Sequence, residues 1–331
     1  MTASPRRAAP ALSCKRIAAG SLLVVAVLAL GIAPRSSLAS HGGAPSLAGS
    51  PPREYGCPIL PASNPLNQDI SHAPVDPRSA AYIASIGLTA HLHPDFGTDP
   101  SYGIPYAVVG PRQPRVPITF TEFGEESNPG PYPIPPDAPV EGAGEAGDRH
   151  VLVLQRGSCR LYELYDAQPS GAGWQAASGA VFNLHSNALR PEGWTSADAA
   201  GLPIFPLLVR YPEVAAGQID HALRVTVERT QRGYIHPATH LASSSGDPNL
   251  PPMGLRLRLK TGFSLASFHG ESLIVLRALK RYGLIVADNG SPWYITGAPD
   301  PRWNDEDLEQ IKRVPGSAFE AVRTGPILHA G

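Results

Sequence analysis

The chain has 331 residues, and its 27 basic and 28 acidic side chains give a formal net charge of −1. Hydrophobic residues make up 42% of the chain and charged residues 17%, which supports a buried core and excludes a coiled coil or a charged disordered tail as the main structure. The 37 prolines and 33 glycines together supply about a fifth of the chain, so long irregular segments are expected.

The segment 1–39 has the three-part layout of a secretory signal. Four basic residues precede an uncharged apolar run at 17–33, and Ala39 ends a small-residue cleavage motif. We therefore expect a signal peptide and a secreted or extracellular protein. The alternative is a cell-envelope protein anchored by an uncleaved signal, because the run is at the low edge of what spans a bilayer.

Cleavage after Ala39 changes the charge of the chain. The signal holds five of the 27 basic residues and none of the 28 acidic ones, so the remaining chain has a net charge of −6. Nucleic-acid binding requires a basic surface, and nucleic acid is therefore not expected as a partner. A membrane is expected as a partner only if the signal is uncleaved.

The two cysteines that follow the signal, Cys57 and Cys159, predict one disulfide in an oxidising compartment. The bond would tie the proline-rich N-terminal segment to the rest of the domain. Two separate buried thiols are the alternative.

Proline usage divides the chain. A flexible leader at 40–53 precedes a single β-rich domain at 54–331, in which 54–149 forms a proline-rich arm and 150–331 holds the sheet core and the C-terminal helices. Between residues 41 and 140 there are 20 prolines, against six between 141 and 240. Proline cannot donate to a sheet ladder, so the arm is not expected to supply central strands, and we expect it to lie over the scaffold. One short helix is expected within it, at 78–86.

Strand patterns dominate the region after residue 150. A hairpin is predicted at 150–165, and a further strand follows it at 180–185. Two prolines inside 202–211 indicate an edge strand or a bulge. The strictest alternation of apolar and polar residues, which is typical of strands, occurs at 221–228 and 253–260.

Helical spacing returns near the C-terminus, at 271–282 and 305–314, with a hairpin expected between the two helices around an Asn-Gly turn. Many short strands, long loops and few helices predict a mainly β fold. We expect a β-sandwich or jelly roll with peripheral short helices and a long proline-rich N-terminal arm.

The common catalytic signatures are missing from the sequence. There is no G-x-S-x-G, H-E-x-x-H, P-loop or G-x-G-x-x-G pattern. One weak metal motif is present, because His91, His93 and Asp95 alternate as on one strand face and could hold a transition metal. Pro94 interrupts that strand, so a polar loop is the alternative interpretation. No other cofactor is expected.

Two further histidines are candidates for a general base or acid, because imidazole titrates near neutral pH. His221 stands at the entry of a predicted strand beside Asp220, and His236 lies in a proline-containing segment. A structural role is the alternative for each of them.

The polar face of the alternating strands is a third candidate site. Glu163 and Tyr165 share one strand face, and Arg224 lies on the polar face of another strand. An arginine fork binds carboxylates bidentately, which suits a uronic-acid polymer. A solvated sheet face is the alternative interpretation.

Paired carboxyl groups are the fourth candidate, since glycosidic hydrolysis commonly uses two. Asp198, Glu213, Asp220 and Asp288 lie near the ends of predicted elements, where site residues gather. Asp198 and Glu213 also fit first-turn helix charges, and for Asp288 the interpretation as a turn residue is the stronger one.

Four tracts resemble a group of uncharacterised exported bacterial proteins. The resemblance implies that the exported chain is one unit, and it brings no activity, fold or catalytic residue. The tracts lie at 57–71, 150–167, 193–211 and 287–303.

The leading hypothesis is an exported protein that interacts with carbohydrate, with a polysaccharide or cell-envelope glycan as its partner. As a polysaccharide lyase it would use His221 or His236 as the base, Tyr165 as the acid and Arg224 as the carboxylate clamp. As a hydrolase it would draw its pair from Glu163, Asp198, Glu213 and Asp220.

Two alternatives belong to other functional classes. One is a non-catalytic cell-envelope or adhesion module, which would bind its ligand without turnover. The other is a metal-dependent enzyme that uses His91, His93 and Asp95.

Overall fold

The structure is a computed structural model that describes residues 50–144 and 147–329. The predicted signal and most of the predicted leader lie outside the described residues. The described residues belong to one compact unit. Within the described ranges, no helix has both the length and the apolar character needed to cross a membrane.

The largest sheet has six strands, which pair in both directions. Its central strand β11 is parallel to β13 and antiparallel to β14, and β14 is parallel to β3 at the edge. In spatial order the strands are β15 (Phe319–Val322), β12 (Arg256–Leu259), β13 (Leu284–Asn289), β11 (Leu223–Val227), β14 (Tyr294–Thr296) and β3 (His93–Asp95).

Three smaller sheets complete the strand content. The four-stranded sheet has the order β10 (Ser178–Asn183), β7 (Arg160–Tyr165), β6 (Val151–Gln155) and β4 (Tyr106–Val109). The three-stranded sheet has the order β5 (Ile118–Phe120), β9 (Gly173–Ala176) and β8 (Gln168–Ser170). A short ribbon joins β1 (Arg53–Glu54) to β2 (Cys57–Pro58).

The helices are few and short. The α-helices are α1 (Ser79–Ile86), α2 (Tyr211–Ala215), α3 (Gly270–Arg281) and α4 (Asp305–Leu308). Short 3₁₀ segments are η1 (Pro65–Asn67), η2 (Gly124–Glu126), η3 (Glu141–Gly144), η4 (Phe205–Leu207), η5 (Glu309–Arg313) and η6 (Gly316–Ala318), of which η3 is kinked at Gly142 and Ala143. The helices predicted at 78–86, 271–282 and 305–314 are confirmed as α1, α3 and α4 with η5.

A mainly β fold is confirmed, with strands in several mixed sheets and few short helices. The narrower prediction of a sandwich or jelly roll is not confirmed. Each of the three larger sheets contains at least one parallel pair, whereas the strands of a jelly roll are antiparallel.

The proline-rich arm takes part in the sheets, where we expected it to lie over them. It supplies β3, β4 and β5, and each of these is the edge strand of its sheet. A residue without a backbone N–H is tolerated at an edge but not in the middle of a ladder. The expectation that the arm would form no central strand is therefore confirmed for these sheets.

Two local predictions were wrong. The segment 202–211, expected as an edge strand or a bulge, does not form a strand. Pro206 lies inside the 3₁₀ turn η4, and within the segment only Val209 pairs, in an isolated parallel bridge with Gly297. The expected hairpin after residue 283 is not formed either, because β11 lies between β13 and β14. The loop joining β13 to β14 crosses the end of β11, where Gly290 N–H donates to the Val227 carbonyl at 2.9 Å.

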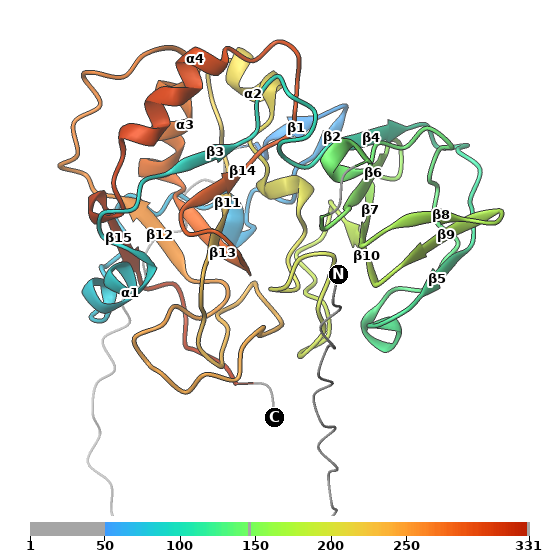
Figure 1. Cartoon of the computed structure of the whole chain (residues 1–331), viewed down its shortest axis with the longest axis horizontal. Coiled ribbons are helices and arrows are strands. Elements are labelled where there is room, and N and C mark those ends of the chain that lie inside the picture. The colour runs from blue at the N-terminus through green and yellow to red at the C-terminus, as the bar shows by residue number, and fades with distance from the viewer. Residues whose placement is uncertain (1–49, 145–146, 330–331) are drawn as a thin grey trace, which may run out of the picture. The chain divides into compact units, whose positions relative to one another are not determined.

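The four-stranded sheet is buried on both faces. Leu152 and Leu154 of β6 belong to the main hydrophobic core, while Val151 and Val153 belong to a smaller core that includes Trp174 of the three-stranded sheet. Alternate side chains of a strand point to opposite faces, so β6 separates the two cores. Figure 1 shows the three- and four-stranded sheets side by side, and α3 beside α4 on the six-stranded sheet.

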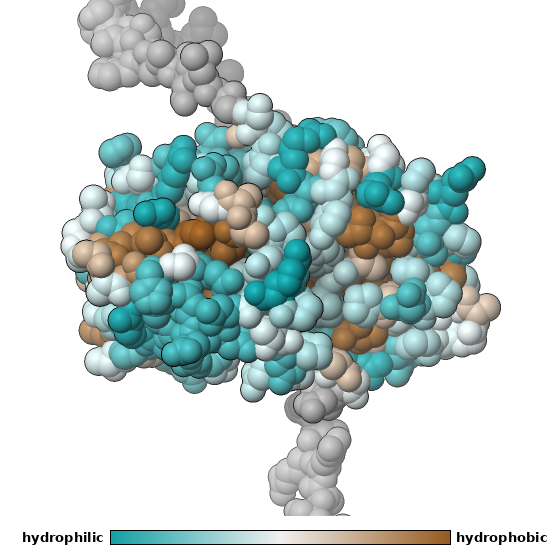
Figure 2. Space-filling view, turned by 90° about the horizontal axis from the view of Figure 1, so that it is seen from above, coloured by the Kyte–Doolittle hydropathy of each residue, from teal (hydrophilic) through white to brown (hydrophobic). Residues whose placement is uncertain are grey.

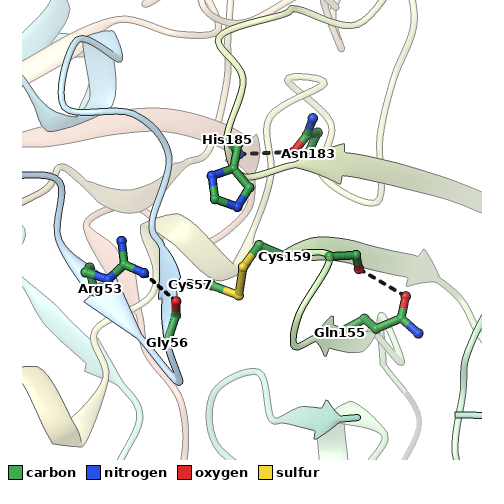
Figure 3. The surroundings of a disulfide bond; sticks show 8 residues. Arg53, Gly56, Cys57, Gln155, Cys159, Asn183 and His185 are labelled. Atoms are coloured by element: carbon green, nitrogen blue, oxygen red, sulfur yellow. Dashed lines mark hydrogen bonds between the residues drawn. A yellow bond between two sulfur atoms is a disulfide. The ribbon is translucent and has the colours of Figure 1, made fainter. Parts of the chain in front are cut away.

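The predicted disulfide is confirmed. Cys57 and Cys159 are bonded with their Cα atoms 5.4 Å apart, across a sequence separation of 102 residues (Figure 3). The bond joins β2 to the turn that precedes β7. It agrees with an oxidising compartment.

The face shown in Figure 2 is mostly hydrophilic. Its hydrophobic residues lie in separate patches among polar ones. This face therefore presents no single broad apolar surface.

Candidate functional site

Two adjoining cavities of about 310 and 200 Å³ share Asp148, Asp288 and Asn289 in their walls. We call the two together the acidic cleft. Six carboxyl side chains line it, against one arginine and two histidines. The carboxyls belong to Asp95, Glu122, Glu141, Asp148, Asp198 and Asp288, and the basic residues are Arg224, His150 and His240.

Arg224 lies at the buried base of the cleft. It binds Asp198 bidentately, with Nε to Oδ2 at 3.0 Å and Nη2 to Oδ1 at 2.9 Å. The same Nη2 donates to Asp288 Oδ2 at 3.0 Å, and Nη1 donates to Thr296 Oγ1 at 2.9 Å. Burial opposes the charge of Arg224, but the two carboxylates raise its pKa above the ordinary value. The sequence left a solvated sheet face as the alternative interpretation of this strand. That alternative is wrong at Arg224, because its side chain is buried.

Asp288 is a cleft carboxyl with a strongly raised pKa. It lies near the end of β13, and 22% of its side chain is exposed. Burial and the charge of Asp198 raise its pKa to about 6, while Arg224 and the Asn289 N–H act in the opposite direction. Asp288 therefore exchanges a proton close to neutral pH, as a general acid must.

His150 and Glu141 form a buried ion pair in the wall. His150 stands immediately before β6, with Nδ1 2.5 Å from Glu141 Oε2 and Nε2 2.9 Å from the Ala197 carbonyl. Burial lowers the pKa of His150, but the charge and hydrogen bond of Glu141 outweigh it and raise the pKa to about 9. Both ring nitrogens then donate, so the imidazole is a fixed cation and no base.

The remaining carboxyls keep the cleft acidic. Burial and the nearby Glu141 raise the pKa of Asp95, which reaches the cleft from the edge strand β3. Asp148 lies in both cavities and is exposed, and Glu122 lines the larger one. Tyr165 and Tyr294 add aromatic rings to the walls, and the Tyr294 ring is stacked on His93 at 4.1 Å between centroids.

Three of the predicted catalytic residues meet in the cleft: Tyr165, Asp198 and Arg224. Asp198 is 1% exposed and engaged by Arg224, so it acts on its neighbours rather than on a ligand. Tyr165 is the accessible member of the three, in the wall beside Asp148.

His221 and Glu213 lie elsewhere, in a buried cluster with Arg210. His221 Nε2 is 3.1 Å from Glu213 Oε1, and Arg210 Nη2 is 2.8 Å from the same oxygen. His221 has no exposed surface, and Glu213, in the first turn of α2, is 8% exposed. Neither side chain faces the cleft. Inside the core Glu213 pairs with Arg210, and His221 Nε2 also lies 2.9 Å from Arg210 Nη2.

Glu163 is also fully buried. Its carboxylate accepts hydrogen bonds at 2.9 Å from the backbone N–H groups of Ile204 and Phe205. Burial raises its pKa to about 7 although these bonds oppose the rise. Glu163 shares a strand face with Tyr165, but the segment around Phe205 covers it.

Asp220 and His236 are near the surface and outside the cleft. Asp220 accepts a hydrogen bond from the Tyr282 hydroxyl at 3.1 Å. His236 pairs with Glu192 at 2.7 Å, with 44% of the histidine side chain exposed. The geometry brings neither residue to Arg224 or Tyr165.

The three residues of the metal motif make separate contacts. His91 Nδ1 is 2.8 Å from the Lys312 carbonyl, His93 is stacked on Tyr294, and Asp95 lines the cleft. Throughout the part of the chain that the structure describes, no three His, Cys, Asp or Glu side chains are grouped as a metal site.

Sequence reasoning missed Glu141, Asp148 and His150. The first two lie in a Pro/Gly/acidic segment, whose low complexity resembles a simple linker. The available signal was His150 itself, a polar residue at the junction between that segment and a strand buried on both faces. Comparison of the chain with protein-family models, curated proteins and solved structures finds no match.

Proposed function

We propose that the protein is an exported glycan hydrolase that acts in the acidic cleft. The observation that carries the proposal is Asp288, a partly exposed carboxyl with a pKa of about 6 beside the buried Asp198–Arg224 pair. Carboxyls whose surroundings shift their pKa values apart are the usual acid and base of glycosidic hydrolysis.

Asp288 and Asp148 are the proposed pair, since each lines both cavities. A sugar bound across the junction of the cavities contacts both side chains. Protonated Asp288 donates its proton to the departing glycosidic oxygen. Asp148, as the carboxylate, either activates a water molecule or attacks the anomeric carbon, depending on the separation of the two groups.

The same charges disfavour the lyase hypothesis. Arg224 is already bound by two carboxylates, so it offers no free fork to a uronate. The excess of carboxyls repels a polyanion, and neither His221 nor His236 reaches the cleft. We therefore propose neutral or amino-bearing glycans as substrates, with Tyr165 and Tyr294 as surfaces for sugar rings.

A non-catalytic glycan-binding module is the second candidate. The bidentate Arg224–Asp198 pair favours it, because a fully engaged pair at the base of a cavity is also a common structural feature. This candidate predicts binding to the same glycans without any product.

Turnover by the purified full chain separates the candidates. The protein is incubated with neutral, amino-bearing and uronic-acid polysaccharides, and new reducing ends are followed together with the ultraviolet absorbance of unsaturated products. We expect reducing ends alone, from the first two groups. Unsaturated products would contradict the hydrolase proposal, and binding without either signal would establish the module.

Substitution of Asp288 tests its role directly. Asp288→Asn should lower kcat/KM by about 100-fold or more, because the proton donor is lost. In the unsubstituted protein kcat/KM should fall as the pH rises above about 6, since only protonated Asp288 donates, and the variant should lose this dependence. Asp137→Asn, an exposed aspartate outside the cleft, is the matched control and should leave both readings unchanged.

A further inference from the structure

A third cavity, of about 230 Å³, shares no lining residue with the acidic cleft. Four asparagines, two arginines and several apolar side chains form its walls, and we call it the amide pocket. The polar members are Asn64, Asn128, Asn183, Asn187, Arg160 and Arg190. No acidic residue lines it, although acidic residues outnumber basic ones in the chain as a whole.

Arg190 is a buried cation whose hydrogen bonds all go to neutral acceptors. It is 8% exposed and donates from Nε to the Thr195 carbonyl at 2.7 Å and from Nη1 to Asn128 Oδ1 at 2.7 Å. Its Nη2 donates to the backbone carbonyl of Glu126, whose carboxylate accepts instead from the Thr195 N–H. Burial lowers the pKa of Arg190 to about 10, so it is still charged at neutral pH.

A buried charge is stable in a protein when an opposite charge accompanies it. The carboxylates of Glu163 and Glu126 act on Arg190 from outside the pocket, and the Phe182 and Trp194 rings lie 5.8 and 5.6 Å from its guanidinium. No acidic residue lines the pocket itself, so an anion bound there would place an opposite charge at the cavity wall. Arg160, the first residue of β7, adds a second guanidinium to the same wall and is exposed to the cavity opening.

The asparagines offer donors rather than acceptors. The carbonyl oxygens of Asn64, Asn128, Asn183 and Asn187 already accept hydrogen bonds from other groups of the chain. Asn64 and Asn187 each already use one N–H, toward Asn187 Oδ1 and Ser63 Oγ. One N–H of each of these two and the amide groups of Asn128 and Asn183 are left for a carbonyl or carboxylate oxygen on a ligand. Apolar surface from Leu60, Phe182, Leu189 and Leu202 lines the same cavity.

We propose that the amide pocket binds an N-acylated amino acid, the chemical unit found at the carboxyl end of a peptide. The carboxylate binds Arg160, whose planar fork matches its two oxygens, and lies beside the positive charge of Arg190, whose three nitrogens already donate within the protein. The acyl carbonyl accepts from the asparagine N–H groups. The aliphatic side chain lies against the leucines and Phe182.

The disulfide holds two walls of this pocket together. Cys57 precedes the arm residues Leu60 and Asn64, while Cys159 is bonded in sequence to Arg160. Figure 3 shows Asn183 and its hydrogen bond to His185 next to the disulfide. A covalent link between opposite walls reduces the ordering that ligand binding requires.

Binding of N-acetyl-leucine to the full chain, measured by titration calorimetry, tests the proposal. N-acetyl-leucinamide is the matched probe, because it keeps the shape and loses the charge. We expect the carboxylate to bind at least 10-fold more tightly than the amide. Inorganic phosphate is the third probe and should bind more weakly than the carboxylate.

Arg160→Gln should weaken N-acetyl-leucine binding by 10-fold or more, and it is preferred to a change at buried Arg190 because it leaves the fold intact. Arg112→Gln, an exposed arginine outside the pocket, is the control and should leave binding unchanged. Equal binding of the acid and the amide, tighter binding of phosphate, or no binding of N-acetyl-leucine at millimolar concentration would each overturn the proposal. Glycan turnover does not enter this test.

Discussion

The acidic cleft and the amide pocket are opposite in charge. In the cleft the one arginine is bound by two carboxylates and further carboxyls are left over, whereas in the pocket both arginines have only neutral neighbours among the lining residues. The charge that each wall lacks indicates the ligand that it would accept.

One connecting segment contributes to both cavities. Arg190 and Pro191 line the amide pocket, Thr195–Ala199 line the cleft, and Gly201–Pro203 return to the pocket. The hydrogen bond from Arg190 Nε to the Thr195 carbonyl joins the two parts of the segment. Substitutions in one cavity therefore also test whether the other cavity keeps its binding or activity.

The largest expected effect is on stability, at the base of the cleft. Arg224→Met would leave Asp198, which is 1% exposed, without its partner, and breaking such a buried pair costs about 3–5 kcal/mol. The free energy of unfolding from urea titrations measures this loss. The same change at the exposed Arg160 should cost less than about 0.5 kcal/mol. If Arg224→Met and Arg160→Met lowered the free energy of unfolding by similar amounts, Arg224 would not be a buried, paired charge in contrast to the exposed Arg160.

Removal of the disulfide should have the next largest effect. The double variant Cys57→Ser, Cys159→Ser loses a link that closes a loop of 102 residues, and such a loss costs about 2–5 kcal/mol. Thermal unfolding monitors the change in stability. N-acetyl-leucine binding should weaken in this variant while glycan turnover at low temperature is kept, because the bond joins walls of the pocket only. If N-acetyl-leucine binding and glycan turnover fell by the same factor, the disulfide would not act specifically on the walls of the amide pocket.

A smaller effect is expected from pH at His150. Its pKa in the folded state is about 9, above the value of 6.5 for the free side chain, so the folded state holds the proton more tightly. The resulting stabilisation is complete below about pH 6.5 and disappears as the pH rises through 9, a change on the order of 1–3 kcal/mol. His150→Gln should remove this part of the pH dependence of the unfolding free energy. An unchanged dependence would show that His150 is neutral in the folded protein.

Local patterns predicted the local elements of this fold. The hairpin β6–β7, the strand β11 and the helix α3 each follow from apolar spacing within about a dozen residues. The insertion of β11 between β13 and β14 was missed, because neighbouring strands and an Asn-Gly turn normally indicate a hairpin. The partner that displaced the hairpin lies some 60 residues earlier in the chain, where short-range patterns carry no signal.

The candidate site was predicted only in part, for a related reason. Tyr165, Asp198 and Arg224 were recognised by residue type and by their positions in or near strands, and the structure places them in one cleft. His221 and Glu213 have the same residue types and are buried in the core. Residue type indicates what a side chain can do, whereas tertiary packing decides whether a ligand reaches it.

The strand order of the six-stranded sheet also determines when the sheet can be completed. Its strands come from residues as far apart as His93 and Val322, and the central β11 pairs with two strands that follow it in the chain. A chain that emerges N-terminus first, from a ribosome or through a membrane pore, displays β3 and β11 long before their partners exist. Early strands must stay unpaired during that interval, when open edges favour association between chains. Folding of this sheet therefore waits for nearly the whole chain, and dilution or a chaperone that covers β3 and β11 should raise the yield of refolded protein.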